Sequence, residues 1–307
     1  MTGTPPSQQE VLDYFKALSN WGRWGPDDQL GTLNLITPEK RAAAAQSVRD
    51  GLSVNCARLL QFEDRAADVL YPPQHYMYRT GQSPEATSSA DFLGVSCHGL
   101  TVSHVDALSH QFWNGKMYND RDQDLINATE GATIYSVDEM RDGIVTRGVL
   151  LDLTRVFDKP YLEAGEAIYP EHLEEAEKAH GVTVEEGDAL LVNTGWFRRR
   201  GEVGPYPVFR HRPGLHASTM PWLRERGVAV VGGDAAQDAV PSGYEDIHMP
   251  LHSIGMVAMG LCLIDNLQFE DLIPVCDEKK RWSFLFILAP LRIRYGTGSP
   301  ATPLAIF

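Results

Sequence analysis

The sequence is poor in cysteine. Its 307 residues include only Cys56, Cys97, Cys262 and Cys276, and no two of them form a CxxC pair. In a chain of this length, so few cysteines favour free thiols in a reducing compartment over a disulfide framework. The sequence also lacks a basic N-terminal segment followed by an apolar run, and it lacks an apolar run of membrane-spanning length. We therefore expect a cytoplasmic protein.

Positive charge is scarce as well. The chain has 27 Lys and Arg against 41 Asp and Glu, which gives a net charge of −14. Such a balance argues against non-specific nucleic-acid binding and against an electrostatic anchor to anionic lipid. The GxSxG elbow of serine hydrolases, the GxGxxG dinucleotide motif and the P-loop are all absent. These absences leave a small-molecule enzyme of another class as the main expectation.

Helical and strand-like segments alternate along the chain, with an apolar fraction of 43%. This pattern predicts an α/β fold in which helices cover the strands. Helices are expected at 7–19, 37–51, 169–181 and 218–227, a helix-to-strand unit at 252–265, a long loop at 66–90, and strands at 52–60, 94–108, 144–154, 188–196, 228–236 and 284–294, the last split by Pro290. We expect an N-terminal helical extension over 1–51, packed on a catalytic domain over 52–307.

Residues 98–110, HGLTVSHVDALSH, hold three histidines and one aspartate. Side chains alternate between the two faces of an extended strand, so His98, His104 and Asp106 are expected on one face, with His110 just beyond it. Imidazole and carboxylate are the ligands that suit zinc, manganese or iron. The segment therefore predicts a metal-binding or acid–base centre.

The same segment resembles a family signature. SHVDALSH is similar to the HxGTHxDxPxH pattern of the cyclase family that includes bacterial kynurenine formamidase and isatin hydrolase. The runs WGPDDQLGTLN, WNGKMYN, GDALLVNTGW and LIDNLQFEDL resemble further blocks of this family, and the likeness covers residues 20–300. The chain resembles in particular the longer branch of the family, whose members are about as long as this chain. The resemblance implies a mixed central β-sheet or barrel-like β layer surrounded by helices, and a homodimer or homotetramer.

The resemblance also implies roles for individual residues. His104 and Asp106 would bind a divalent metal, zinc or manganese, and His110 would act as the catalytic acid–base. His104 and Asp106 would take part in catalysis through the same site. A later histidine and an acidic residue would complete one or two metal positions.

Several positions depart from the family pattern. Leu100 occupies the place of the first signature histidine, and His98, two residues earlier, is the candidate to replace it as a ligand. Ser103 stands where the family has threonine, and Leu108 where it has proline. Because leucine cannot bind a metal, the metal itself becomes an open question.

The late ligands depart too. Where the family has a Glu-Asn pair, this chain has Asp265-Asn266, and His252 lies thirteen residues before Asp265. His252 and Asp265 are the expected metal ligands, and His248 is a second candidate for the histidine. Asp265 has the alternative reading of a turn residue.

Aromatic residues near glycine-rich or irregular segments are candidates for the substrate site. We expect Trp24, Trp113, Tyr76 and Tyr118 to hold an aromatic or cyclic substrate, although such residues often only pack. Asp234 follows a buried strand, where α/β folds place functional residues; a cap or turn role is the alternative.

Three functions fit these observations. The first is metal-dependent hydrolysis of a small cyclic or aryl amide, lactam or lactone, with a metal-activated water and His110 as acid–base. The second is a dehydratase, cyclase or isomerase that uses the same His/Asp site without a metal. The third is a non-catalytic oligomer that binds a small ligand.

Overall fold

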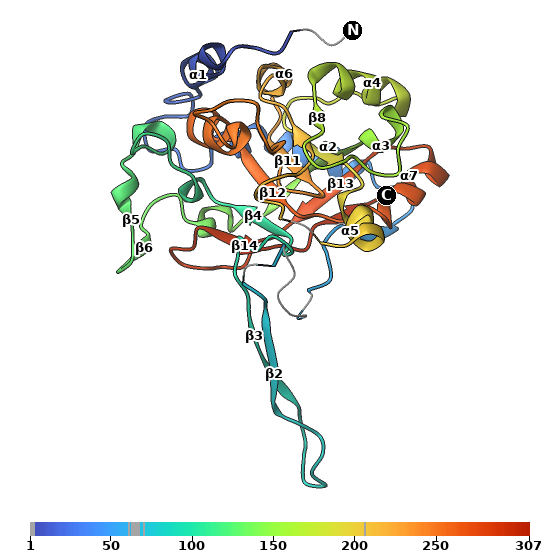
Figure 1. Ribbon diagram of the computed structural model, residues 1–307. Helices are drawn as coiled ribbons and strands as arrows, with labels where there is room; N and C mark the ends of the chain where they lie inside the picture. Colours follow the sequence, from blue (N-terminus) through green and yellow to red (C-terminus); the bar gives the residue numbers. More distant parts are fainter. Residues whose placement is uncertain (1–3, 61, 63–67, 70, 206) are drawn as a thin grey trace.

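A mixed, curled nine-stranded sheet forms the centre of the protein and is flanked by helices (Figure 1). A computed structural model describes residues 4–60, 62, 68–69, 71–205 and 207–307. The strand order is β1-β15-β13-β7-β9-β11-β12-β4-β14. The strands are β1 (Ser53–Asn55), β4 (His104–Asp106), β7 (Ile144–Asp152), β9 (Ala189–Asn193), β11 (Val230–Gly233), β12 (Cys262–Asp265), β13 (Ser283–Leu288), β14 (Gly298–Pro300) and β15 (Leu304–Ile306). The expected fold class is confirmed.

Smaller elements surround the sheet. Short strands form three separate ribbons: β2 (Gln74–Arg79) with β3 (Ala90–Gly94), β5 (Ile126–Asn127) with β6 (Gly131–Ala132), and β8 (Ala167–Ile168) with β10 (Gly214–Leu215). The helices are α1 (Gln8–Ala17), α2 (Pro38–Gln46), α3 (Leu153–Val156), α4 (Pro170–His180), α5 (Trp196–Val203), α6 (Thr219–Arg226), α7 (Leu272–Lys279) and the π-helix η6 (Leu251–Met259). Within the described part of the chain, none of the helices combines the length and the apolar character needed to cross a membrane.

Four neighbouring strands, β7, β9, β11 and β12, run parallel. Their sequences are nearly continuous apolar runs because both faces of this region are covered. Alternate residues serve two cores: Leu150 and Leu191 join one buried cluster, whereas Leu151 and Leu190 join the other. The carboxyl ends of parallel strands meet at one edge of a sheet, which is where open α/β sheets place their ligand sites.

The N-terminal segment is tied to η6. The Trp21 indole donates to the carbonyl of Val257 (2.7 Å), and the Asn20 side chain donates to the carbonyl of Met259 (2.8 Å). Gly31 lies so close to Gly260 that a Cβ on Gly31 would collide with the Gly260 carbonyl. The expected N-terminal extension is thus in contact with the element that carries His252.

Local structure differs from the expectations in several places. The expected strand 94–108 is wrong apart from His104–Asp106, because residues 99–102 form turns closed by backbone hydrogen bonds. The expected strand 52–60 is limited to Ser53–Asn55, and the second half of the pair at 284–294 is not a strand. The helix expected to reach residue 51 ends at Gln46.

The expected loop 66–90 is also wrong in its described part. Residues 74–94 contain the β2–β3 hairpin, which projects away from the body of the protein (Figure 1). Residues 66, 67 and 70 of the expected loop lie outside the described residues.

We predict that Gly31→Ala destabilises the fold. Gly31 has a φ of +57°, and its Cβ would meet backbone rather than a flexible side chain. The left-handed strain and the overpacking together should cost at least about 2 kcal/mol of the free energy of unfolding, measured by urea denaturation. Gly22→Ala is the matched control, because Gly22 has a φ of +75° and a Cβ added there would meet nothing within 4 Å. Equal losses in the two variants would refute the role of the Gly31–Gly260 contact.

Candidate active site

The site is built around Asp106, on the short strand β4. This strand lies between β12 and β14, and its register with β12 places Asp265 opposite His104. His104 and Asp106 are two residues apart and therefore share one face of the strand. All three side chains are buried. Sheet pairing thus brings together three residues that are separated by up to 161 positions in the sequence.

The His104 ring is held in one tautomer. Its Nδ1 donates to the carbonyl of Val102 at 2.7 Å, so Nε2 carries the free lone pair of the neutral ring. That Nε2 lies 3.5 Å from Oδ1 of Asp106. A histidine with one nitrogen engaged by a carbonyl and the other facing a carboxylate has the arrangement typical of metal ligands.

His252 enters the site from the first turn of η6. Its Nδ1 donates to Oδ2 of Asp238 at 2.5 Å, and Asp238 also accepts the backbone N–H of Leu251 at 2.6 Å. The free Nε2 of His252 lies 3.7 Å from Oδ2 of Asp106 and 3.6 Å from Oδ2 of Asp265. Asp238 therefore fixes both the start of η6 and the orientation of the ring.

Asp265 is oriented by an amide. Its Oδ1 accepts a hydrogen bond from Nε2 of Gln237 at 3.0 Å, which leaves Oδ2 facing His252.

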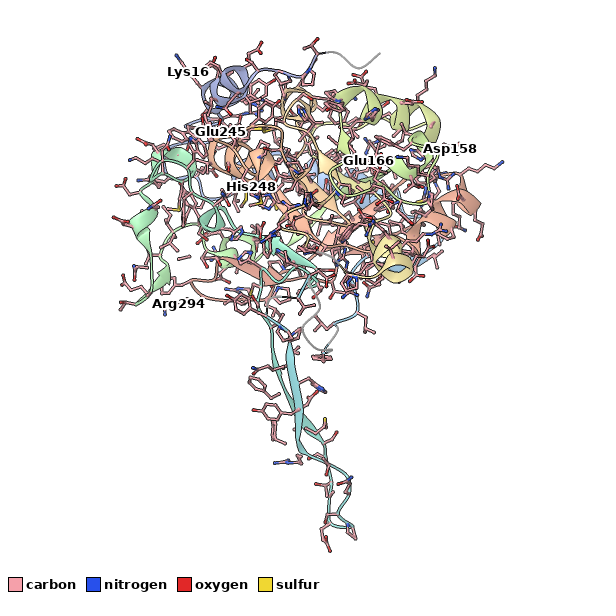
Figure 2. The ribbon with its side chains drawn as sticks, viewed as in Figure 1. Lys16, Asp158, Glu166, Glu245, His248 and Arg294 are labelled. Atoms are coloured by element: carbon pink, nitrogen blue, oxygen red, sulfur yellow. The ribbon has the colours of Figure 1, made fainter. Side chains whose placement is uncertain are left out.

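Of the two candidates for the late histidine ligand, His252 and His248, the structure brings His252 into the site. His248 is exposed on the loop that precedes η6 (Figure 2).

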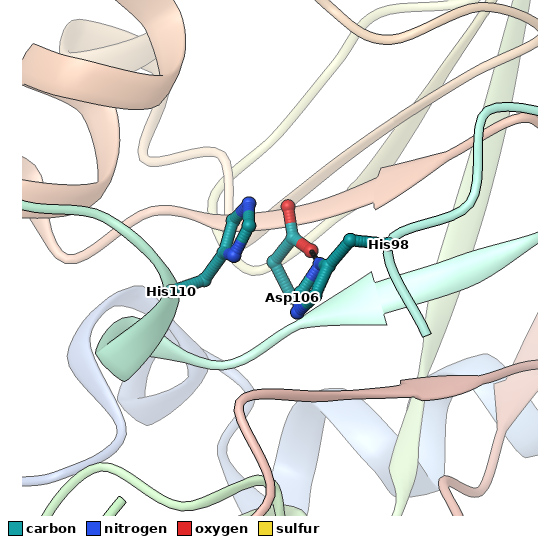
Figure 3. A group of neighbouring side chains, drawn as sticks. All are labelled: His98, Asp106 and His110. Carbon is teal, nitrogen blue, oxygen red and sulfur yellow. Dashed lines mark ion pairs between the residues drawn. The ribbon is translucent and has the colours of Figure 1, made fainter. Parts of the chain in front are cut away.

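His98 and His110 close the other side of Asp106 (Figure 3). Nδ1 of His98 lies 2.9 Å from Oδ1 of Asp106, and its Nε2 lies 3.0 Å from the Thr297 hydroxyl. The His98 and His110 rings are stacked, with centroids 3.7 Å apart and planes within 9°. His98 reaches Asp106 from a turn before the strand, and not along the strand face as the sequence pattern predicts.

The geometry fits a metal ion. Ligand atoms at about 2.1 Å from a tetrahedral ion lie about 3.4 Å from one another. His104, Asp106 and Asp265 form one group of potential ligands. Separations close to this value join Asp106 to His104 (3.5 Å) and to His252 (3.7 Å), and His252 to Asp265 (3.6 Å). Both carboxylate oxygens of Asp106 are buried, and although His98 lies 2.9 Å from Oδ1, neither oxygen accepts a well-aligned hydrogen bond from the described residues. Asp106 also forms a second group of potential ligands with His98 and His110.

The charges in the site call for a cation. Burial opposes the ionisation of Asp106, but His110, His98 and His104 hold the pKa of that carboxyl well below its usual range. Burial also opposes the charged form of His252, yet Asp238 and Asp265 outweigh it and raise the pKa of His252 to about 10. The carboxylates around His252 therefore favour a positive charge at this point, which either the protonated ring or a metal ion bound to the neutral ring would supply.

His110 has a different environment. Burial is the main influence and lowers the pKa of His110 to about 4, although the charge of Asp106 works in the opposite direction. The ring is neutral at neutral pH and remains partly exposed. It can therefore accept a proton from a molecule that enters the site.

A hydrogen-bonded frame supports the segment before β4. The Ser103 hydroxyl donates to the carbonyl of Asn266 (2.6 Å) and accepts the backbone N–H of Arg58 (2.8 Å). The buried Arg58 guanidinium donates to the carbonyls of Leu267 and Asp234. Ser103 thus uses its hydroxyl to join β4 to the chain beyond β1 and to the end of β12.

Leu100 occupies the position where the family has its first histidine ligand. Its side chain packs against a small apolar cluster with Trp196 and Val208.

Asp234 accepts the backbone N–H groups of Thr194 and Trp196 (2.9 and 2.8 Å) and caps the start of α5. The cap interpretation of Asp234 is therefore the one that the contacts support.

The four aromatic candidates lie in different surroundings. Trp113 is partly exposed, stacks on Phe15 and follows His110 by three residues. Tyr118 is buried, and its hydroxyl donates to Asp28 at 3.1 Å. Trp24 packs on a core cluster, and Tyr76 is exposed on the β2–β3 hairpin. Their role in substrate binding stays a prediction.

Sequence reasoning missed the residues that orient the ligands. Asp238 and Gln237 follow β11 in the run GGDAAQD, in which the sequence pattern pointed only to Asp234. A polar run directly after a buried parallel strand is the signal that could have identified them. Thr297 and Arg58 carry no such signal, because their contacts depend on the tertiary fold.

Several solved structures have the same fold. A crystal structure described as a novel cyclase has a TM-score of 0.86 and 29% identity, covering 94% of this chain and 100% of that chain. Isatin hydrolase A from Ralstonia solanacearum has a TM-score of 0.61 and 19% identity, with 99% of both chains covered. Isatin hydrolase A from Labrenzia aggregata, bound to benzyl benzoate, has a TM-score of 0.60 and 23% identity over 86% of this chain and 95% of its own. No curated protein matches the sequence.

The family assignment comes from the sequence itself. Residues 39–237, well over half of the chain, match the family model described as "Putative cyclase". The match includes β4 with His104 and Asp106, and also His98 and His110, and the fold agrees with it. The protein therefore belongs to the cyclase family.

Proposed function

We propose that the protein is a metal-dependent hydrolase of a small cyclic or aryl amide, lactam or lactone. The observation that carries this proposal is the buried Asp106 carboxylate, which accepts no well-aligned hydrogen bond from the described residues and faces the Nε2 atoms of His104 and His252. Two structures of the same fold are isatin hydrolases, and isatin is a cyclic amide fused to an aromatic ring.

His104, Asp106, His252 and Asp265 would hold the ion, with zinc or manganese as the expected metal. A divalent ion at this place supplies Lewis-acid chemistry, since it lowers the pKa of water and polarises a carbonyl group. Val102, Asp238 and Gln237 keep the ligand atoms turned inward.

His110 performs the proton transfers. Its neutral ring accepts a proton from water while the water oxygen forms a bond to the carbonyl carbon. The ring then returns this proton to the leaving nitrogen or oxygen as its bond to carbon breaks. Stacking on His98 holds the plane of the His110 ring.

We propose that Trp113 lies against the ring of the substrate. This residue is partly exposed and lies three residues beyond His110.

We predict that metal and activity disappear together. The purified protein should bind zinc or manganese, and exhaustive chelation should abolish hydrolysis of isatin, N-formylaniline or dihydrocoumarin, whichever is a substrate. Asp106→Asn should lower both metal affinity, measured by calorimetry, and turnover by at least about 100-fold. Turnover that survives chelation would instead support acid–base chemistry without a metal.

Replacement of His110 should separate binding from catalysis. His110→Gln is expected to lower kcat by about 10²–10⁴-fold, because it removes the group that accepts and returns the proton. The exposed His248→Gln is the matched control and should keep wild-type kinetics. If His110→Gln retains full kcat, His110 is not the acid–base.

Asp238→Asn tests the orientation of His252. Loss of the carboxylate beside Nδ1 should lower metal affinity by about 10–100-fold, as is typical of residues that orient metal-binding histidines. Calorimetric titration of the metal-free variant measures this effect, and an unchanged affinity would exclude His252 from the ligand set. Circular dichroism would establish that the variant is folded.

A further inference from the structure

A second cavity lies at the carboxyl ends of β7 and β9. Its volume is about 440 Å³, and its lining includes Asp152 and Asn193, the last residues of these two strands. Neighbouring strands lie about 4.8 Å apart, so the junction of β7 with β9 is about 14 Å along the sheet from the junction of β12 with β4. The cavity is therefore separate from the His/Asp site, although it lies at the sheet edge where α/β folds bind ligands.

Positive charge gathers around this cavity. Three cations line it: Arg155 from α3, Lys159 from the loop after α3, and Arg198 from α5. Only two carboxylates, Asp152 and Glu270, are in the same lining, which gives it a net charge of +1. The whole chain has a net charge of −14. A positive hollow in so acidic a protein favours an anionic ligand.

The Asp152 carboxylate is fully engaged by the protein. Its Oδ1 accepts hydrogen bonds from the Asn193 amide and the Thr154 hydroxyl, both at 2.7 Å. Its Oδ2 accepts from Nε of Arg155 at 2.9 Å, and the residue is buried. Asp152 thus fixes the end of β9 and the Arg155 side chain, and its charge is compensated within the frame of the cavity.

Lys159 and Arg198 have weaker ties. Lys159 pairs with the partly exposed Glu166, and Nε of Arg198 donates to the exposed Glu202, one helical turn away, at 2.8 Å. Exposed ion pairs of this kind contribute little to stability, so a ligand can compete with them. The bond to Glu202 is the only hydrogen bond that the Arg198 guanidinium makes to the described residues. Its two Nη groups can therefore bind two oxygens of one carboxylate or phosphate group.

The remaining lining suits an organic molecule. Pro160, Ile273 and Pro274 supply apolar surface. Gly195, the residue before α5, has a φ of +71°, and a Cβ there would collide with the Pro160 carbonyl. This contact holds the loop after α3 against the start of α5, whose N-terminus adds partial positive charge. The helices α3, α5 and α7 gather at this side of the molecule (Figure 1).

We propose that this cavity is a second binding site, for a small organic anion with a carboxylate or a phosphate group. The anionic group lies between Arg198 and Lys159, and the apolar part of the ligand lies against Ile273 and Pro274. The side chains that would bind the ligand differ from those proposed to hold the metal, so this site does not depend on the proposed hydrolase function.

Calorimetric titration of the purified protein tests the proposal with benzoate, phenyl phosphate, inorganic phosphate and the uncharged benzamide. At least one of the two organic anions should bind, more tightly than benzamide and inorganic phosphate do. Whichever organic anion binds more tightly identifies the preferred group. If neither binds, or if benzamide binds equally well, the proposal is overturned. Equal binding of inorganic phosphate and the better organic anion would overturn the organic class of the ligand.

Variants locate the site. Lys159→Gln combined with Arg198→Gln should raise the dissociation constant of the organic anion by about 10–100-fold, because hydrogen bonds to charged groups are lost. The exposed Arg210→Gln, outside the cavity, is the matched control and should bind like the wild type. Circular dichroism would establish that each variant is folded.

Asp106→Asn separates this site from the metal site. The variant should bind the organic anion with wild-type affinity, whatever its effect on metal and turnover. Anion binding that is lost in Asp106→Asn, or that survives the Lys159/Arg198 substitutions, would place the anion elsewhere and overturn the proposal. These readouts do not require turnover, so a failure here leaves the proposed hydrolase function untouched.

Discussion

The structure depends on the burial of one carboxylate. Asp106 lies on β4, beside the edge strand β14, and both of its oxygens are buried without a well-aligned hydrogen bond from the described residues. An uncompensated charge in such a place is strongly unfavourable. Its neighbours are imidazoles: His104 on the same strand, His252 from a helix, and His98 with His110 on the other side. The site is thus organised around a negative charge that requires a cation.

The fold supplies this arrangement through a change of strand direction. Parallel strands end at β12, and antiparallel β4 pairs with the end of that strand, so that Asp265 lies opposite His104. The polar run after β11 provides Asp238 and Gln237, which orient His252 and Asp265. Beyond Asp265, Asn266 adopts a φ of +59° and its carbonyl accepts from Ser103. Turn geometry, strand register and ligand orientation therefore depend on one another.

Spacing along the chain is sufficient to predict part of the site. His104 and Asp106 share a strand face because they are two residues apart. His252 is a candidate because it lies thirteen residues before Asp265, although this spacing and the Asp-Asn pair both depart from the family pattern. Spacing fails for His98, because the strand is only three residues long and His98 returns to Asp106 through a turn. It gives no indication of Asp238, whose role depends on contact with η6. The sequence predicts a loop in place of the β2–β3 hairpin because none of the β2 residues faces a core, and strand prediction relies on such a face.

We propose that His104, Asp106, His252 and Asp265 hold a divalent ion. X-ray absorption spectroscopy of the zinc-loaded protein tests this claim most directly. We expect nitrogen and oxygen scatterers at about 2.0–2.2 Å, with the multiple-scattering pattern of two imidazoles. We expect no sulfur, since burial raises the pKa of the nearby Cys262 thiol and disfavours a thiolate. A sulfur scatterer at about 2.3 Å, or a shell without imidazole, would contradict the proposal.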